Sequence, residues 1–179
     1  MSHLLRNALL LLTITLVALG NAVAQQSNNT PVNTEEQAEQ QRAAAFYQHL
    51  LTHVFADDIN YLSALMNYPL LYGDDDNRSS GKPSEIANAE EFVENYHNIF
   101  TPTIKRVLAC RHADDFFTNS EGVMVGAGSL WFSLTYIGDD STVRPIDYLD
   151  DPRYWQLKVV AVYDGAHARR DAEQCEAEQ

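Results

Sequence analysis

The stretch from Gly122 to Tyr136 constrains the fold of this chain more than any other. It reads Gly-Val-Met-Val-Gly-Ala-Gly-Ser-Leu-Trp-Phe-Ser-Leu-Thr-Tyr, the most apolar run beyond the N-terminal segment. Side chains alternate along it with the period of two that is typical of strands, and the glycines at 126 and 128 mark a bend between two strands. A sheet with one strongly apolar face needs helices packed on that face. The side chains expected there are Leu130, Phe132, Leu134 and Tyr136, joined by Trp155, Leu157, Val159 and Ala161 of a last strand at 154–163.

The N-terminus has the pattern of a secretory signal peptide, residues 1–24. Met1–Arg6 is a short basic start, Ala8–Leu19 is apolar apart from two threonines, and Ala22–Ala24 supplies small residues for signal peptidase. The apolar run is shorter than the about 20 residues that a membrane-spanning helix needs. We expect cleavage near Ala24, a periplasmic or secreted product, a disordered leader at 25–34 and no later membrane span. A retained N-terminal anchor is the alternative.

The charge balance narrows the class of partner. The chain has 12 lysines and arginines against 25 aspartates and glutamates, a net charge of −13, and loss of the signal with its single Arg6 makes it −14. An acidic surface repels phosphate groups, so nucleic acid and anionic membranes are disfavoured as partners. A basic protein partner fits this charge, but solubility is the simpler explanation, because net charge determines solubility before it determines recognition.

The chain has two cysteines, Cys110 and Cys175. In an exported protein they could form one disulfide that pins the C-terminal tail to the body of the domain. The alternative is a buried free Cys110 and a tail thiol that pairs with another molecule.

Helices are predicted between the leader and the apolar strands. Thr34 and Gln37 form a capping box at the start of a long amphipathic helix that reaches residue 54, and Asp58 can cap a second helix. Asn88 with Glu91 caps a third helix, and a fourth covers 104–110. A short strand at 70–72 lies between the second and third helices. Acidic loops are expected at 73–82 and 138–153, and a polar tail, either loose or helical, at 165–179.

Helices followed by antiparallel strands indicate an α+β domain. At residues 35–164 the chain resembles the NTF2-like (SnoaL-like) superfamily through this element order, Tyr68-Pro69-Leu-Leu, Ile99-Phe100-Thr-Pro102 and the run from Gly122 to Phe132. The last run is similar to exported bacterial members of unassigned activity. The resemblance implies one domain in which N-terminal helices pack on a curved antiparallel sheet, a cystatin-like cone with a pocket at its wide end.

Two patterns in the sequence are weak matches to metal-binding motifs. His49 and His53 have the spacing of metal ligands on a helix, but no glutamate of a metalloprotease helix lies between them and no third ligand is evident. Asp74, Asp76 and Glu85 are spaced somewhat like a calcium loop, yet Arg78 and Ser79 stand where an oxygen ligand and a glycine are needed. We therefore expect no metal and no cofactor.

The superfamily contains isomerases, dehydratases and many non-catalytic modules, so membership alone does not indicate function. Function has to be inferred from the individual residues. The inward positions of the strands carry no acid, which favours a non-catalytic binding module over an enzyme. Its partner would be a small hydrophobic ligand or a protein, as in immunity or inhibitor proteins. Candidate ligand contacts are Tyr68, Tyr72, Tyr96, Trp131, Tyr136 and Trp155, each of which could instead be a core residue.

The second hypothesis is a small cone-fold isomerase or hydro-lyase. Such an enzyme needs a carboxylate or imidazole held in a pocket beside a hydroxyl donor. The candidates for these roles are Tyr61, Tyr68, His97, His112 and Asp115, with His97 or an aspartate as the base. A homodimer across the open sheet, or a structural subunit of an envelope assembly, is compatible with either hypothesis.

Overall fold

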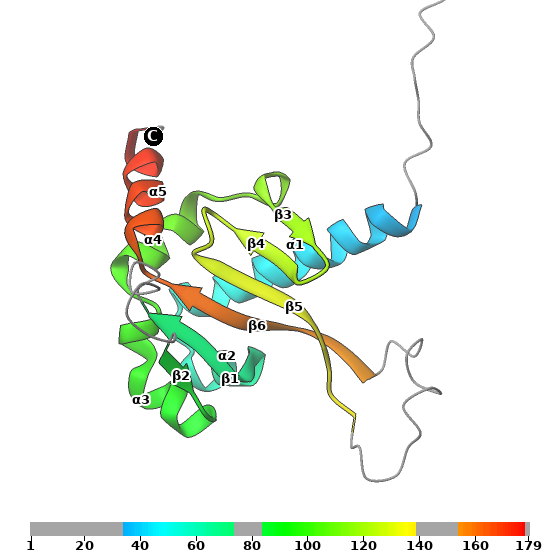
Figure 1. Ribbon diagram of the computed structural model, residues 1–179, viewed down its shortest axis with the longest axis horizontal. Coiled ribbons are helices and arrows are strands. Elements are labelled where there is room, and N and C mark those ends of the chain that lie inside the picture. The colour runs from blue at the N-terminus through cyan, green and yellow to red at the C-terminus, as the bar shows by residue number, and fades with distance from the viewer. Residues whose placement is uncertain (1–33, 74–83, 139–153, 178–179) are drawn as a thin grey trace, which may run out of the picture. The chain divides into compact units, whose positions relative to one another are not determined.

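The computed structural model describes residues 34–73, 84–138 and 154–177, and these form an α+β fold with five helices and one curved, open sheet of six strands (Figure 1). The predicted signal peptide and leader and most of both acidic loops lie outside the described residues. The helices are α1 (Thr34–Phe55), α2 (Ile59–Leu65), α3 (Ala89–Ile99), α4 (Pro102–Cys110) and α5 (Ala166–Ala177), with one 3-10 turn at Ala113–Asp115. The strands are β1 (Met66–Gly73), β2 (Ser84–Ile86), β3 (Phe117–Asn119), β4 (Gly122–Val125), β5 (Leu130–Tyr136) and β6 (Trp155–Tyr163).

The helix starts follow the predicted caps. The side chain of Asp58 accepts a hydrogen bond from the backbone N–H of Tyr61, and Asn88 does the same for Glu91 at 3.0 Å. Each cap satisfies a backbone N–H that the first turn of a helix leaves without an intrahelical partner. None of the helices in the described ranges is at once long enough and apolar enough to cross a membrane.

The sheet is mixed, and the prediction of a purely antiparallel sheet was wrong at one pair. The strand order is β2-β1-β6-β5-β4-β3, and β1 pairs in parallel with β6 while the other neighbours are antiparallel. A parallel neighbour requires a long connection, which α3, α4 and β3–β5 provide here. The valine-rich β6 therefore occupies a central position with a partner on each side.

A bulge in β6 redistributes the side chains between the two faces of the sheet. Phe132 pairs with Val159, but Trp131 pairs with Ala161, so one extra residue stands at 160. Val159 and Val162 consequently both belong to the core, and Ala161 lies beside Trp131 on the opposite face. The prediction that Ala161 shares a face with Val159 was wrong, because a one-residue slip reverses every later side chain.

The core lies between the helices and one face of the sheet. Figure 1 shows α1 running behind β4 and β5, with α3 beside β1 and β2. Tyr47 of α1 is fully buried, and its hydroxyl donates a hydrogen bond of 2.8 Å to the carbonyl of Leu108 in α4. Burial raises the pKa of this phenol well above its ordinary value. A buried aromatic with a satisfied hydroxyl fixes the angle between α1 and α4.

The stretch expected to be a polar tail is α5, and it packs against α4. Cys110 and Cys175 form a disulfide, with their Cα atoms 5.9 Å apart. Next to it, the buried carboxylate of Asp171 pairs with Arg111 and accepts a hydrogen bond from the backbone N–H of Ala127 at 3.1 Å. α5 therefore belongs to the same compact unit as the helices and strands from Thr34 onward.

The predicted bend between β4 and β5 is confirmed and is held by α5. Gly126 has φ +62 and Gly128 has φ +96, both in the left-handed region that favours glycine. At Gly126 a Cβ would collide with the carboxylate of Asp171 and come within 2.9 Å of Val107. The bend therefore connects two strands and also packs against α5.

Candidate functional site

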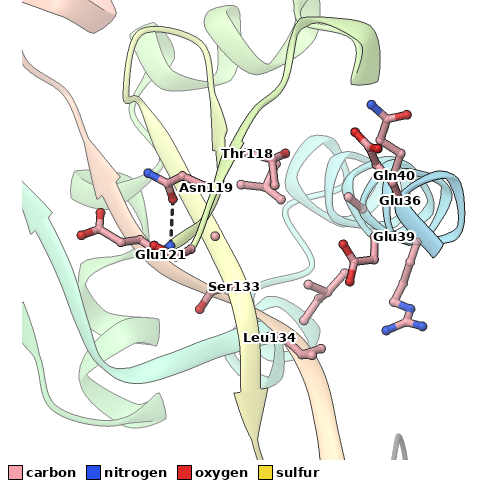
Figure 2. A pocket seen from close by; sticks show the side chains of 14 residues that line it. Glu36, Glu39, Gln40, Thr118, Asn119, Glu121, Ser133 and Leu134 are labelled. Atoms are coloured by element: carbon pink, nitrogen blue, oxygen red, sulfur yellow. Dashed lines mark hydrogen bonds between the residues drawn. The ribbon is translucent and has the colours of Figure 1, made fainter. Parts of the chain in front are cut away.

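A cleft of about 550 Å³ lies between the first half of α1 and the sheet (Figure 2). Strands β3 to β5, the β3–β4 turn and one residue of β6 form its other side. The lining residues are Glu36, Glu39, Gln40, Arg42, Ala43, Thr118, Asn119, Ser120, Glu121, Gly122, Val123, Ser133, Leu134 and Leu157. Its volume is within the range of about 300–1,000 Å³ that is usual for small-molecule sites.

The cleft exists because α1 is longer than the core that it covers. Residues 34–42 are all exposed, and burial along the helix begins at Ala43. The first turns are rich in Glu and Gln and have no apolar stripe with which to close onto the sheet. They still form helix, since carboxylates at Glu35 and Glu36 interact favourably with the positive end of the helix dipole.

The floor of the cleft is apolar and its α1 wall is acidic. Leu134 and Leu157 lie on the floor, and Leu134 is 44% exposed although it sits within a strand of the sheet. Glu36 and Glu39 of α1 lie on one side of this floor, whereas Glu121 in the β3–β4 turn points its side chain away from α1 (Figure 2). All three glutamates are exposed, and Arg42 is the one cation among the described residues that line the cleft. No salt bridge between described residues involves any of these three glutamates.

This arrangement can hold a positive charge above an apolar surface. The carboxylates of Glu36 and Glu39 offer acceptors for charge-assisted hydrogen bonds, and the partly exposed Leu134 gains by being covered. No histidine, cysteine or tyrosine is among the described residues that line the cleft. The cleft therefore lacks the imidazole or phenol that the enzyme hypothesis needs beside a carboxylate.

No family model, curated protein or solved structure matches this chain. The resemblance to the NTF2-like superfamily therefore stays a prediction from the sequence, and the structure shows the α+β class alone.

None of the six aromatic residues proposed as ligand contacts is among the residues that line this cleft. Tyr96 is fully buried, and its hydroxyl lies 3.1 Å from the carbonyl of Val54 and 3.0 Å from a carboxylate oxygen of Asp57. Tyr68 is half-buried and donates to the carbonyl of Ser63 at 2.9 Å, and burial raises its pKa to about 12. Both tyrosines thus have structural roles.

The other four aromatics are divided between the core and two parts of the sheet. Tyr72 is half-buried and packs against the core. Trp131 is half-buried on the face of the sheet opposite α1. Tyr136 and Trp155 lie together where β5 and β6 are paired near Leu157, with ring centroids 5.6 Å apart.

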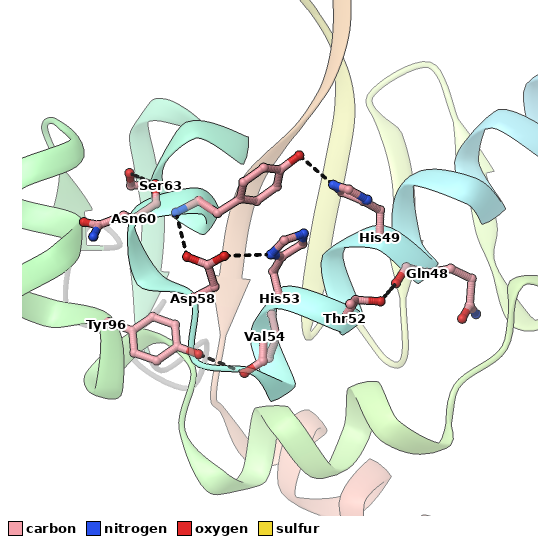
Figure 3. Close-up of polar contacts among 10 residues, drawn as sticks. Gln48, His49, Thr52, His53, Val54, Asp58, Asn60, Ser63 and Tyr96 are labelled. Atoms are coloured by element: carbon pink, nitrogen blue, oxygen red, sulfur yellow. Dashed lines mark hydrogen bonds and ion pairs between the residues drawn. The ribbon is translucent and has the colours of Figure 1, made fainter.

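The candidate acid–base residues do not converge on a cavity. Tyr61 and His49 come together, with 2.6 Å between the phenol oxygen and Nε2, and His53 stacks on the ring of Tyr61 at 3.8 Å (Figure 3). The Nδ1 atom of His53 also lies 3.1 Å from the carboxylate of Asp58. This cluster is on an exposed corner between α1 and α2.

Nothing in the described part of the chain brings three histidine, cysteine or acidic side chains into position for a metal ion. His97 lies on the exposed side of α3 against the ring of Tyr96, and His112 and Asp115 belong to the 3-10 turn. The candidates for catalysis are therefore dispersed over three separate parts of the surface.

Proposed function

We propose that this protein is an exported, non-catalytic binding module of the NTF2-like kind, whose ligand occupies the cleft between α1 and the sheet. The ligand presents a positive charge to Glu36 and Glu39 and rests an apolar part on Leu134 and Leu157. The observation that carries the proposal is an apolar floor beside an α1 wall whose two glutamates form no salt bridge with another described residue. The signal-peptide pattern of residues 1–24 supports export.

The composition of the cleft favours binding over catalysis. Proton transfer needs an acid or base whose pKa is tuned by burial, and the carboxylates of the cleft are exposed. The imidazole of His49 and the phenol of Tyr61, which lie 2.6 Å apart, face solvent on the α1–α2 corner. An isomerase or hydro-lyase therefore has less support than a binding protein.

Two probes of equal shape and opposite charge test the proposal. Tryptamine and indole-3-propionate share an indole ring and differ in the sign of the charge on a short chain. Tryptamine is expected to bind, with chemical-shift changes in NMR spectra at Ala43, Leu134 and Leu157, and with weaker binding at high salt. Indole-3-propionate is expected not to bind.

A pair of variants separates the cleft from the overall acidity of the protein. Glu36→Gln/Glu39→Gln removes two carboxylates of α1 and is expected to weaken tryptamine binding about tenfold, since each charge-assisted hydrogen bond contributes about 1.5–3 kcal/mol before desolvation is subtracted. The control Glu90→Gln/Glu94→Gln changes two exposed glutamates of α3, again with one in the first turn. Equal loss in both variants, or equal binding of the anionic probe, would refute the proposed site.

A further inference from the structure

The cleft borders the free edge of a strand. β3 is last in the sheet order, and within the described residues it pairs on one side alone, with β4. Thr118 and Asn119 of this strand also line the cleft. Building on the proposed function, we propose that the cleft takes an extended, basic segment of a partner protein, which adds to the sheet as a seventh strand beside β3.

The edge of β3 is open to such an addition. Phe117, Thr118 and Asn119 are all exposed, and Phe117 is 54% exposed although it is a large apolar side chain. An edge strand presents backbone N–H and C=O groups that can pair with another chain, and proteins usually block such edges with lysine, proline or a bulge. β3 has none of these, and its register with β4 is regular. The strand at the other edge of the sheet, β2, does not border the cleft.

The two faces of an added strand would meet different surroundings. Thr118 pairs with the core-facing Val123, and its side chain points toward α1, where Glu36 and Gln40 lie (Figure 2). Phe117 pairs with Met124 and is on the opposite face. Since side chains alternate along a strand, every second residue of the segment would face the carboxylates and the others would lie beside Phe117.

The spacing of the acidic residues suits this alternation. Residues two apart on a strand are about 6.7 Å apart, and Glu36 and Glu39 are about 4.5 Å apart along the helix axis. The flexible stems of lysine or arginine can cover this difference. The sequence expected of the segment is therefore basic, apolar, basic. The net negative charge of the chain would also accelerate the approach of such a partner at low salt.

Synthetic peptides test the strand addition separately from the cleft. The parent is acetyl-Lys-Val-Lys-Val-Lys-amide, and two derivatives carry N-methyl groups on both valines or on the three lysines. The backbone N–H groups of an added strand point toward β3 at alternate residues only, either the valines or the lysines. Methylation of the N–H groups that pair with β3 is expected to lower affinity about tenfold or more, and the other derivative should bind nearly as well as the parent peptide. Hydrogen exchange should slow at a backbone amide of β3 when the parent binds and stay unchanged with tryptamine.

The outcomes distinguish this inference from the proposed function. If both N-methylated peptides bind as well as the parent, or if tryptamine binds and the parent does not, strand addition is wrong and the cation-binding cleft stands. If neither the parent nor tryptamine binds, both proposals are wrong. Binding of the parent that is unaffected by Glu36→Gln/Glu39→Gln would place the peptide elsewhere and also overturn the inference.

Discussion

Two ion pairs join α4 to α5, and they differ mainly in burial. Asp171 and Arg111 form the inner pair, with side-chain exposures of 4% and 18%. Arg106 and Glu176 form the outer pair at 2.8 Å, with exposures of 49% and 60%. We predict that Asp171→Ala destabilises the protein strongly and that Glu176→Ala has almost no effect.

The magnitudes follow from what each change leaves behind. Without Asp171, the guanidinium of Arg111 stays largely buried without its counter-charge, and the backbone N–H of Ala127 loses its acceptor. Breaking a buried pair from one side costs about 3–5 kcal/mol, whereas an exposed pair contributes about 0–1 kcal/mol. In a chain of this size, 1 kcal/mol shifts Tm by about 2–4 °C, so we expect a loss of at least about 6 °C for Asp171→Ala.

Urea unfolding followed by circular dichroism, with the disulfide intact, measures both variants under the same conditions. The midpoint should fall for Asp171→Ala without a change in the slope of the transition. The double variant Arg111→Met/Asp171→Leu is expected to recover much of the loss, because it removes both buried charges. The reasoning is refuted if Asp171→Ala and Glu176→Ala lower the free energy of unfolding equally, or if the double variant is the least stable. In either case burial of the charges would not explain the contribution of the inner pair to stability.

Two further predictions concern stability. Hydrogen bonds from Lys105, at 2.6 Å, and from Tyr96 lower the pKa of Asp57 below its ordinary 3.8, so its contribution to stability is present above about pH 4 and disappears as the pH falls through the lowered pKa. Asp57→Asn should therefore be less stable than the unmodified protein at pH 7 and equally stable in strong acid. Thermal unfolding at each pH measures this difference, and a difference in Tm that does not change with pH would contradict the prediction. Removal of the disulfide by Cys110→Ser/Cys175→Ser should cost about 2–4 kcal/mol, since the bond closes a loop of 65 residues, and reductant should lower the Tm of the parent but not of the variant.

The features that depend on neighbouring residues could be predicted from the sequence. Asp58 and Asn88, both predicted as caps, each accept a hydrogen bond from a backbone N–H three residues on, at 3.3 and 3.0 Å. The glycines at 126 and 128 mark a bend because their left-handed backbone is costly for other residues. In each of these cases the signal and the structure that it specifies lie within a few residues.

The features that depend on distant residues could not be predicted in the same way. The residues near β6 in the sequence do not indicate that its neighbour β1 runs parallel to it. They also do not indicate the bulge at residue 160, which turns Ala161 to the opposite face of the sheet. In α5 only Ala168, Asp171, Ala172 and Cys175 are buried, so the average composition of the helix is that of a polar tail. Its place in the domain is set by Arg111 and Cys110, some 60 residues earlier.

Aromatic side chains did not indicate the position of the candidate binding site in this chain. The hydroxyls of Tyr68 and Tyr96 have backbone partners inside the domain, so these side chains complete the structure. The glutamates of the cleft are different, because the helix dipole accounts for Glu36 in the first turn but not for Glu39 or for Glu121, which is in the β3–β4 turn. Glu36 and Glu39 lie within one turn of α1 beside an exposed leucine, and the repulsion between their carboxylates contributes nothing to folding. A cation between them would relieve that repulsion, and this is the physical reason to look for the ligand here.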